Sequence, residues 1–396
     1  MHGRVKSAQA VVTAAELAAQ QKKAATYSEL SKVLLLRRKN DVKCSETLEL
    51  TAKMLRSNPD FYTLWNYRKD IIVQQCLDGD IPLAAAMAHK GDRSFAVPLA
   101  AGEAMLQVEL GLTADAIRKN PKCYGAWYHR QWMITYFEFH LKAELGLCAA
   151  LLMTDQRNFH CWNYRRHITL GLSPGGGGGG GGGEGDGVYL GSAGSGKSID
   201  EGQGRHMAAT VSSEFQFSTD KLNENFSNYS AFHHRSVCIQ CLPSPSLSPS
   251  FRALMSTELS LVENAIFTEP DDQSAWWYRR FLFAWLLERA KAAVAGGKGS
   301  GSVDDIGDFL RWIVALVGEQ VVLLEGLLKA EEGCKWAMDA IVGMVRMLLD
   351  LKRLAGPALA EEIDPDLLAR RSELLAQLEE VDPHRRLRYQ ALLRTE

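Results

Sequence analysis

Residues 120–131, NPKCYGAWYHRQ, contain the pattern that decides the fold. An Asn-Pro turn is followed by Trp127 and, three residues later, by Arg130. The residue before a proline avoids helical backbone angles, and residues three apart lie on one face of a helix. The stretch therefore predicts a helix that ends at the turn and a second helix that presents Trp127 and Arg130 side by side.

Four further stretches repeat this pattern along the chain. They are 58–69 (NPDFYTLWNYRK), 155–166 (DQRNFHCWNYRR), 225–236 (NFSNYSAFHHRS) and 270–281 (PDDQSAWWYRRF). A helical segment precedes each copy, so the repeating unit is a helical hairpin, and we expect its Trp and Arg to serve packing. Such a repeat predicts an all-α fold, a right-handed solenoid, or superhelix, of helical hairpins.

The spacing of the copies predicts the domain organisation. We expect a single α-solenoid domain over 1–396, with degenerate terminal helices over 304–396. Trp336 marks a degenerate sixth copy in this interpretation, with Asp339 in place of the arginine. The repeats are predicted near 48–75, 103–138, 144–170, 214–240 and 253–289, with a Gly-rich disordered insertion over 171–208 and a flexible linker over 291–303.

A phosphate-binding loop pattern, GSAGSGKS, occupies residues 191–198 within the Gly-rich insertion. This loop works when a buried strand enters it and a helix leaves it, because the helix N-terminus then holds the phosphates. The flanking sequence predicts neither element, and glycines five apart are frequent in such a tract. We therefore interpret the stretch as part of a flexible surface insertion.

Composition excludes several classes of function. The chain carries 45 Lys and Arg against 47 Asp and Glu, a net charge of −2, which predicts binding neither to nucleic acid nor to an anionic membrane. No run approaches the roughly eighteen apolar residues that a membrane span needs, so no membrane insertion is expected. The eight cysteines are scattered, as in a cytoplasmic protein with reduced thiols, and the start of the chain lacks the apolar core of a secretory signal.

The five copies, in this order and after the start MHGR, resemble the protein prenyltransferase α-subunit repeat family. The residues of these copies are most similar to those of its type II branch, which transfers geranylgeranyl to Rab GTPases. The resemblance implies an obligate heterodimer with a β subunit that holds the zinc and most of the lipid pocket, and a chain that is inactive without that subunit. It also implies geranylgeranyl diphosphate as substrate, Rab C-terminal cysteines as acceptors, and an escort protein that presents them.

The resemblance also implies site residues at the second and third turns. Lys122 and Tyr124 match the P-K-x-Y turn of the relatives, whose Lys and Tyr reach the diphosphate and the substrate cysteine. Asn158, Phe159 and His160 match an N-[YF]-H turn, which makes His160 a catalytic candidate and the other two candidates for substrate binding. The phenyl ring of Phe159 lacks the hydroxyl found in relatives with tyrosine there.

Two further expectations come from the same resemblance. In the type II branch the N-terminal histidine lies near the β-subunit zinc, which makes His2 a candidate autoinhibitory ligand. Animal members also contain immunoglobulin-like and leucine-rich repeat domains, for which this sequence shows no counterpart.

Gly125 separates the type II interpretation from an alternative within the family. The farnesyl and type I enzymes carry a glutamine after the tyrosine, where it binds the free carboxylate of a CaaX tail, and Gly125 has no such donor. An α subunit of those enzymes remains the first alternative. A non-catalytic helical-repeat adaptor is the second, because many solenoids only bind other proteins.

Overall fold

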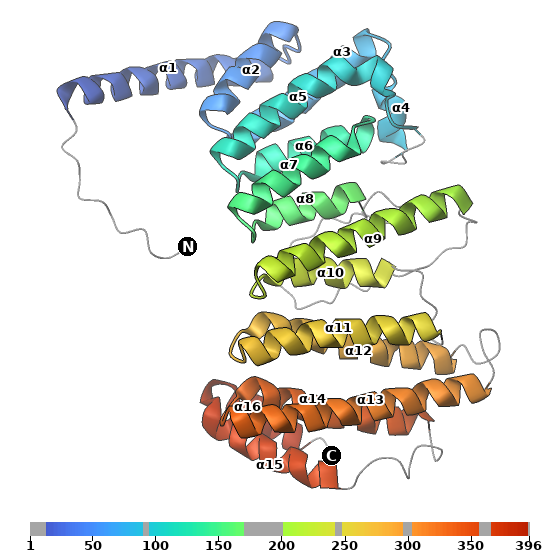
Figure 1. The fold of residues 1–396 in the computed structure, drawn as a ribbon. Helices are drawn as coiled ribbons and strands as arrows, with labels where there is room; N and C mark the ends of the chain where they lie inside the picture. Colours follow the sequence, from blue (N-terminus) through green and yellow to red (C-terminus); the bar gives the residue numbers. More distant parts are fainter. Residues whose placement is uncertain are drawn as a thin grey trace. The chain divides into compact units, whose positions relative to one another are not determined.

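The computed structural model describes residues 13–89, 95–169, 201–241, 248–295, 303–355 and 366–394 (Figure 1). Its contacts divide the chain into two compact units, Met1–Ser195 and Gly196–Glu396. All described secondary-structure elements are helices apart from one isolated bridge between Val97 and Phe137. The prediction of an all-α fold is therefore confirmed, while a single solenoid domain stays a prediction.

The first unit stacks three helical hairpins, α2–α3, α5–α6 and α7–α8, which carry the first three copies of the pattern (Figure 1). The second helices of the hairpins touch in chain order, α3 with α6 and α6 with α8. The helices of the first unit are α1 (Ala14–Lys39), α2 (Ser45–Ser57), α3 (Tyr62–Asp78), α4 (Leu83–Ala88), α5 (Leu99–Lys119), α6 (Tyr124–Tyr136), α7 (Leu141–Thr154) and α8 (Phe159–Thr169).

The second unit repeats this arrangement with the hairpins α9–α10, α11–α12 and α13–α14. Here α10 contacts α12, α12 contacts α14, and α15 packs on both α14 and α16. Its elements are α9 (Glu201–Glu224), α10 (Tyr229–Cys241), α11 (Pro249–Thr268), α12 (Gln273–Ala295), α13 (Val303–Ala330), α14 (Lys335–Ala355), α15 (Asp366–Val381), the short 3-10 helix η3 (Pro383–Arg385) and α16 (Arg386–Leu393).

Two predicted loop boundaries are wrong by several residues. Residues 201–208, which we assigned to the disordered insertion, form the start of α9, because a helix anchored by its buried later part extends at the cost of one residue per hydrogen bond. Residues 291–295 (KAAVA) belong to α12 rather than to the linker, since Ala and Lys are strong helix formers. The stretch 191–198 with its phosphate-loop pattern lies outside the described residues.

In the five hairpins that carry the repeat, an Asn or Asp side chain closes the turn between the two helices. Asn120 Oδ1 accepts a hydrogen bond from the backbone N–H of Lys122 at 3.1 Å, and Asn58 makes the same contact with Asp60 at 3.2 Å. These two residues stabilise the turn itself and do not cap the following helix. In the third and fourth copies the cap comes from Asn158 and Asn228, each of which accepts from the backbone N–H three residues later at 3.1 Å.

The repeated tryptophans pack inside the hairpins, as predicted. Each indole Nε1 donates to the backbone carbonyl six residues earlier, with distances of 2.8–2.9 Å in the four copies that have tryptophan. These residues are Trp65, Trp127, Trp162 and Trp276. All four are at most 5% exposed, and Phe232 in the fourth copy is 1% exposed. The indole therefore ties the start of each second helix to its own turn while filling the core.

Three of the repeated arginines join one hairpin to the next through buried carboxylates. Arg68 of the first hairpin forms a bidentate pair with Glu109 on α5 of the second. Arg130 does the same with Glu144 on α7, with both N–O distances at 2.7 Å. In the second unit Arg235 pairs with Glu258 on α11. These arginines are at most 4% exposed.

The same carboxylates also bind the second helix of their own hairpin. Glu109 contacts Nε2 of His129 at 2.9 Å, and Glu144 accepts from the hydroxyl of Tyr164 at 2.6 Å. One carboxylate thus ties three helices from two hairpins. A charge so well hydrogen-bonded can remain ionised away from water.

The last hairpin breaks the repeat. Tryptophan is the fourth residue of α3, α6, α8 and α12, but the fourth residue of α14 is Met338. Trp336 is therefore not the sixth copy of the repeat tryptophan, and Asp339 does not stand in for the repeat arginine. A correct assignment needed the helix start, because the sequence offers a conspicuous tryptophan two residues too early.

Gly125 packs directly against the tryptophan of the preceding hairpin. A Cβ built on Gly125 would lie 2.4 Å from Cδ1 and 2.8 Å from Nε1 of Trp65. Trp65 cannot move away freely, because its Nε1 donates to Pro59 O at 2.8 Å and its ring contacts His129. The close approach of α3 and α6 therefore requires glycine at position 125.

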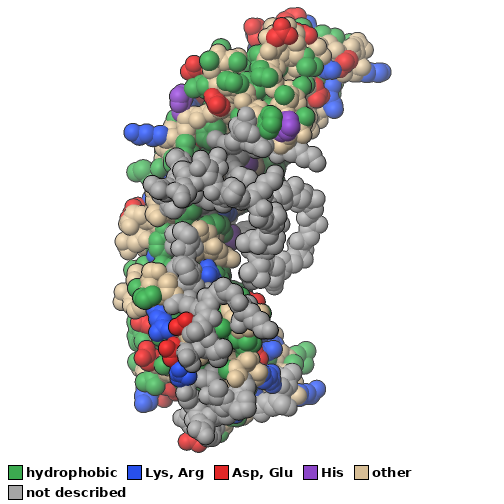
Figure 2. Space-filling view, turned by 90° about the vertical axis from the view of Figure 1, so that its right-hand side faces the viewer, with side chains coloured by type: hydrophobic (Ala, Val, Ile, Leu, Met, Phe, Trp, Pro, Cys, Tyr) green, Lys and Arg blue, Asp and Glu red, His purple; other side chains and the backbone are tan. Residues whose placement is uncertain are grey.

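The described surface carries mixed charge. On the face shown in Figure 2, basic and acidic side chains are interspersed, in line with a net charge of −2. None of the described helices combines the length and apolar character needed to cross a membrane.

The buried carboxylate of Glu109 predicts a pH-dependent stability. Burial alone would raise the pKa of Glu109, but hydrogen bonds from His129 and Arg68 outweigh it and hold the pKa at about 2 against an ordinary 4.5. Glu109 therefore contributes stability that is present above pH 4.5 and lost as the pH falls toward 2. We expect Glu109→Gln to lower the free energy of unfolding at pH 7 by about 3–5 kcal/mol, because Arg68 then remains buried beside a neutral side chain.

Urea unfolding followed by circular dichroism at pH 7 and pH 3 measures this effect. The difference between wild type and Glu109→Gln should shrink at pH 3. Glu103→Gln, at an exposed position of the same helix, is the control and should change little at either pH. An equal loss at both values would contradict the proposed ionisation.

Gly125→Ala is expected to destabilise the first unit by about 1–3 kcal/mol, because the new methyl group collides with Trp65. The matched control is Gly146→Ala on α7, where a Cβ meets nothing within 4 Å. That substitution should be neutral or stabilise by up to about 1 kcal/mol. Similar unfolding midpoints for both variants would show that α3 and α6 do not approach as closely as described.

Candidate functional site

The residues predicted for the site meet where α6 and α8 begin, within the first unit. Lys122 lies in the turn before α6 and Tyr124 is the first residue of that helix. Phe159 and His160 are the first two residues of α8. We call these four residues the α6–α8 rim.

Three rings of the rim contact one another. Tyr124 and His160 meet edge to face, with centroids 4.2 Å apart and an angle of 89°. Phe159 lies 3.9 Å from His160 and 6.1 Å from Tyr124, also between centroids. The phenol of Tyr124 is therefore supported from one side by an imidazole and remains 43% exposed.

The imidazole of His160 is buried, although the neighbouring rings of Tyr124 and Phe159 are exposed. It is 6% exposed, its Nε2 has no hydrogen-bond partner among the described residues, and it lies parallel to Trp127 with centroids 6.5 Å apart. Burial and, to a lesser extent, the charge of Lys122 lower the pKa of His160 below its ordinary value of 6.5. The imidazole is therefore neutral at neutral pH and can act as a hydrogen-bonding group.

Lys122 is the positive charge of the rim. It is exposed, and no carboxylate of the described residues lies within ion-pair distance of its ammonium group. Its backbone is fixed by the contact with Asn120, so the side chain starts from a defined point. A free ammonium on a fixed turn is suited to meet a negative group from another molecule.

Asn158 has a different role from the rim residues. It is 3% exposed, its Nδ2 donates to Pro121 O at 3.1 Å, and its Oδ1 caps α8. Its amide thus links the second and third turns and sets the distance between Tyr124 and His160. The predicted role in substrate binding stays a prediction, while the contacts show a structural function.

Two exposed tyrosines extend the rim, and they were not identified from the sequence. Tyr128 is 60% exposed with its ring 6.2 Å from that of Tyr124, and Tyr62 is 49% exposed at the start of α3. Burial raises the pKa of Tyr62, with smaller contributions from neighbouring groups that include Tyr124 and Tyr128. The repeat could have indicated Tyr62, because it aligns with Tyr124 and Phe159, which also begin their helices.

Metal binding is not supported by the described side chains. No group of three or more His, Cys, Asp or Glu residues in the described ranges could hold a metal ion. All eight cysteines are free thiols. His2, the candidate zinc ligand, lies outside the described residues.

Comparison with known proteins agrees with the repeat pattern. The protein prenyltransferase alpha subunit repeat model matches residues 44–75, 106–137, 141–171, 211–242 and 255–286. The Geranylgeranyl transferase type-2 subunit alpha of Mus musculus is 33% identical over 298 residues, which are 74% of this chain and 42% of that protein. The protein of the same name from Homo sapiens is 33% identical over 297 residues, 73% of this chain and 42% of that protein.

A yeast relative and a solved structure extend the likeness. The type-2 alpha subunit of Saccharomyces cerevisiae is 28% identical over 268 residues, 66% of this chain and 65% of that protein. A chain of the Candida albicans protein geranylgeranyltransferase-I complexed with GGPP aligns with a TM-score of 0.51 at 15% identity, covering 93% of this chain and 90% of that one, which shows the fold alone.

The chain spans about two fifths of the length of its mammalian relatives. The five matched repeats coincide with the five helical hairpins that carry the repeated Trp or Phe and Arg residues. The sequence identity to named α subunits supports the same family. The chain belongs to the protein prenyltransferase alpha subunit repeat family.

Proposed function

We propose that this chain is the α subunit of a heterodimeric type II geranylgeranyltransferase. In this proposal a β subunit binds zinc and geranylgeranyl diphosphate, and an escort protein presents the C-terminal cysteines of Rab GTPases in the cytoplasm. The observation that carries the proposal is the α6–α8 rim, which joins a free cation, an exposed phenol and a neutral imidazole. The names of the relatives support the type II assignment.

The reaction requires positive charge where the diphosphate departs. A cysteine sulfur attacks carbon 1 of the geranylgeranyl group, the carbon–sulfur bond forms, and the carbon–oxygen bond to diphosphate breaks. Negative charge grows on the leaving oxygens, so a fixed cation beside them stabilises the transition state more than the ground state. Lys122 supplies this cation in the proposal.

Tyr124 and His160 have complementary roles in the proposal. The exposed hydroxyl of Tyr124 donates a hydrogen bond to the departing diphosphate. His160 packs edge to face against the Tyr124 ring and is a positioning residue. Its neutral state matters, because an imidazolium beside Lys122 would repel that cation. Zinc chemistry belongs to the β subunit in this scheme, and no step on this chain depends on it.

The exposed aromatic rings of the first unit support a protein partner. Tyr62, Tyr124, Tyr128 and Phe159 are each more than 40% exposed, although large aromatic side chains are usually buried. Exposed aromatic groups are typical of protein interfaces, where a partner covers them. We propose that the β subunit covers this surface.

Gly125 favours type II over the farnesyl and type I alternative. The Cβ of a glutamine at this position would collide with Cδ1 and Nε1 of Trp65, so the packing of α3 against α6 disfavours the carboxylate-binding side chain of those enzymes. A non-catalytic adaptor would not need Lys122. The transfer experiment below distinguishes such an adaptor from an enzyme subunit.

Lys122→Ala is expected to lower kcat/KM for geranylgeranyl transfer by about 10- to 100-fold, because the departing diphosphate loses a fixed cation. Transfer of labelled geranylgeranyl to a Rab with a double-cysteine tail is measured with the chain co-expressed with a type II β subunit and supplied with an escort protein. Lys142→Ala, an exposed lysine on α7, is the control and should retain full activity.

Two results would change the assignment, and a third would change only the role of Lys122. Transfer to a CaaX substrate instead of the Rab would assign the chain to the farnesyl or type I class. A stable complex without transfer would favour the adaptor. Full activity of Lys122→Ala would remove the proposed role of the lysine but not the type II assignment.

A further inference from the structure

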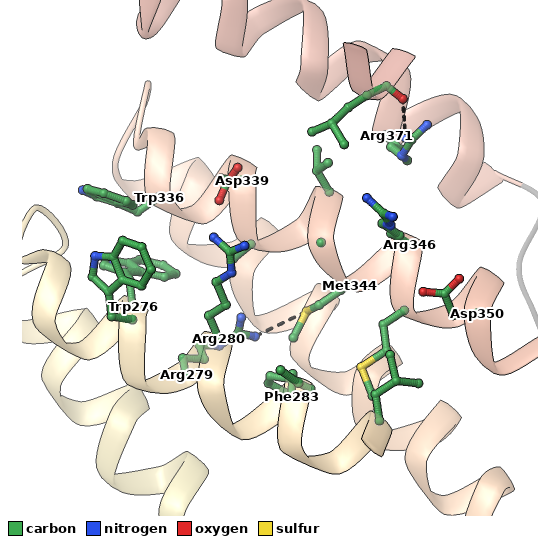
Figure 3. Close-up of a pocket in the computed structure, with 18 of the residues that line it drawn as sticks. Trp276, Arg279, Arg280, Phe283, Trp336, Asp339, Met344, Arg346, Asp350 and Arg371 are labelled. Atoms are coloured by element: carbon green, nitrogen blue, oxygen red, sulfur yellow. Dashed lines mark hydrogen bonds between the residues drawn. The ribbon is translucent and has the colours of Figure 1, made fainter. Parts of the chain in front are cut away.

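The second unit contains a cavity of about 400 Å³ between α12, α14, α15 and α16 (Figure 3). Its volume lies in the range of small-molecule sites. All lining residues belong to this one unit, far along the chain from the α6–α8 rim. The cavity is not used by the proposed transfer reaction.

Arg279, a repeat arginine, lines this cavity, and no carboxylate of the described residues lies within ion-pair distance of its guanidinium. Its counterparts Arg68, Arg130 and Arg235 each form a bidentate pair with a glutamate. Arg279 instead donates to the neutral Gln320 at 3.1 Å and contacts the sulfur of Met344 at 3.4 Å. The side chain is 3% exposed, and its Nε has no hydrogen-bond partner among the described residues.

Burial without a paired carboxylate disfavours the charged form of Arg279. Burial, only weakly opposed by the charge of Glu263, lowers the pKa of Arg279 to about 9 against an ordinary 12.5. A buried guanidinium that lacks its counter-charge is destabilising, and an anion in the cavity would supply that charge.

Further arginines surround the same space. Figure 3 shows the side chains of Arg280, Arg346 and Arg371 around the cavity together with Arg279. Arg280 and Arg346 are exposed, and neither has a carboxylate within ion-pair distance in the described part of the chain. Of the two lining aspartates, Asp339 is already paired with Arg388 at 2.9 Å. The lining therefore carries an excess of positive charge.

Aromatic rings form the apolar walls. Trp276, Trp277, Phe283 and Trp336 line the cavity, and guanidinium groups lie over three of these rings. The distances to the ring centroids are 4.9 Å for Arg279 over Phe283, 5.7 Å for Arg280 over Trp277 and 5.4 Å for Arg385 over Trp336. Arginine forks bind phosphate oxygens, and indole faces stack on planar rings.

We propose that this cavity binds an organic phosphate with a flat aromatic body, a ligand of the nucleotide class. Arg279, Arg280 and Arg346 would hold the phosphate oxygens, and the tryptophan walls would contact the ring. The proposal does not depend on the transferase assignment.

Gly343 provides a way to close the cavity without damaging the fold. It lines the cavity from within α14, and a Cβ added there meets nothing within 4 Å. Replacing a glycine inside a helix by leucine favours the helix. Gly343→Leu should therefore fill the ligand space while α14 remains intact.

Isothermal titration of the full chain with ADP tests the proposal. We expect one ADP per chain, with adenosine and inorganic pyrophosphate each at least about tenfold weaker, because each retains only half of the recognised groups. Gly343→Leu and Arg279→Met should each weaken ADP by at least about tenfold, since a single charged hydrogen bond has that worth. Gly326→Leu, at an exposed glycine on α13 with equal free space, should bind ADP as wild type does.

Lys122→Ala should also leave ADP binding unchanged, which separates this cavity from the rim. Absence of ADP binding, or wild-type binding by Gly343→Leu, would overturn the proposal. An acidic peptide containing tryptophan that binds more tightly than ADP would also overturn it, in favour of a protein partner. Pyrophosphate as tight as ADP would contradict the role of the aromatic walls.

Discussion

The fold depends on the buried arginine–carboxylate pair that joins consecutive hairpins. Burying two charges is costly, and the cost is offset only when the geometry is good and further hydrogen bonds complete it. Arg130 meets this condition, because it binds both oxygens of Glu144 and also donates to Leu110 O and Thr113 Oγ1. A hairpin that slipped along its neighbour would leave two buried charges unpaired. The pair therefore fixes the register of the stack, whereas apolar packing alone would tolerate more variation.

The same register positions the candidate site. Because Arg130 and Glu144 align the second and third hairpins, the first turns of α6 and α8 lie next to each other, and the Asn158 amide bonded to Pro121 O sets their separation. Tyr124 and His160 contact each other for this reason, although they are 36 residues apart in the sequence. At the other end of the repeat array the glutamate is replaced by Gln320, and the unmatched Arg279 lines a cavity. One interaction thus accounts for the order of the repeats and for the place where that order ends.

Much of this could be predicted from the sequence, because the Trp–Arg pattern recurs at fixed helical positions. The hairpins, the buried tryptophans and the grouping of Lys122, Tyr124 and His160 follow from that pattern and from the family resemblance. The carboxylate partners could not be predicted, since Glu109 follows its arginine by 41 residues and Glu144 follows by 14. Three further features depend on contacts between helices, which no local sequence pattern encodes. They are the collision of a side chain at position 125 with Trp65, the structural role of Asn158 and the true register of α14.

In the arrangement that we propose, the second helices of the first unit, with the rim at their N-terminal ends, face a β subunit. Photo-crosslinking tests this most directly, with a benzophenone side chain placed at Tyr128, which is 60% exposed beside the rim, in the chain co-expressed with a type II β subunit. The control is the same group at Met153, 77% exposed on α7, a first helix of a hairpin. We expect a crosslink to the β subunit from position 128 and little from position 153. A crosslink only from position 153, or none from a complex that forms, would contradict it.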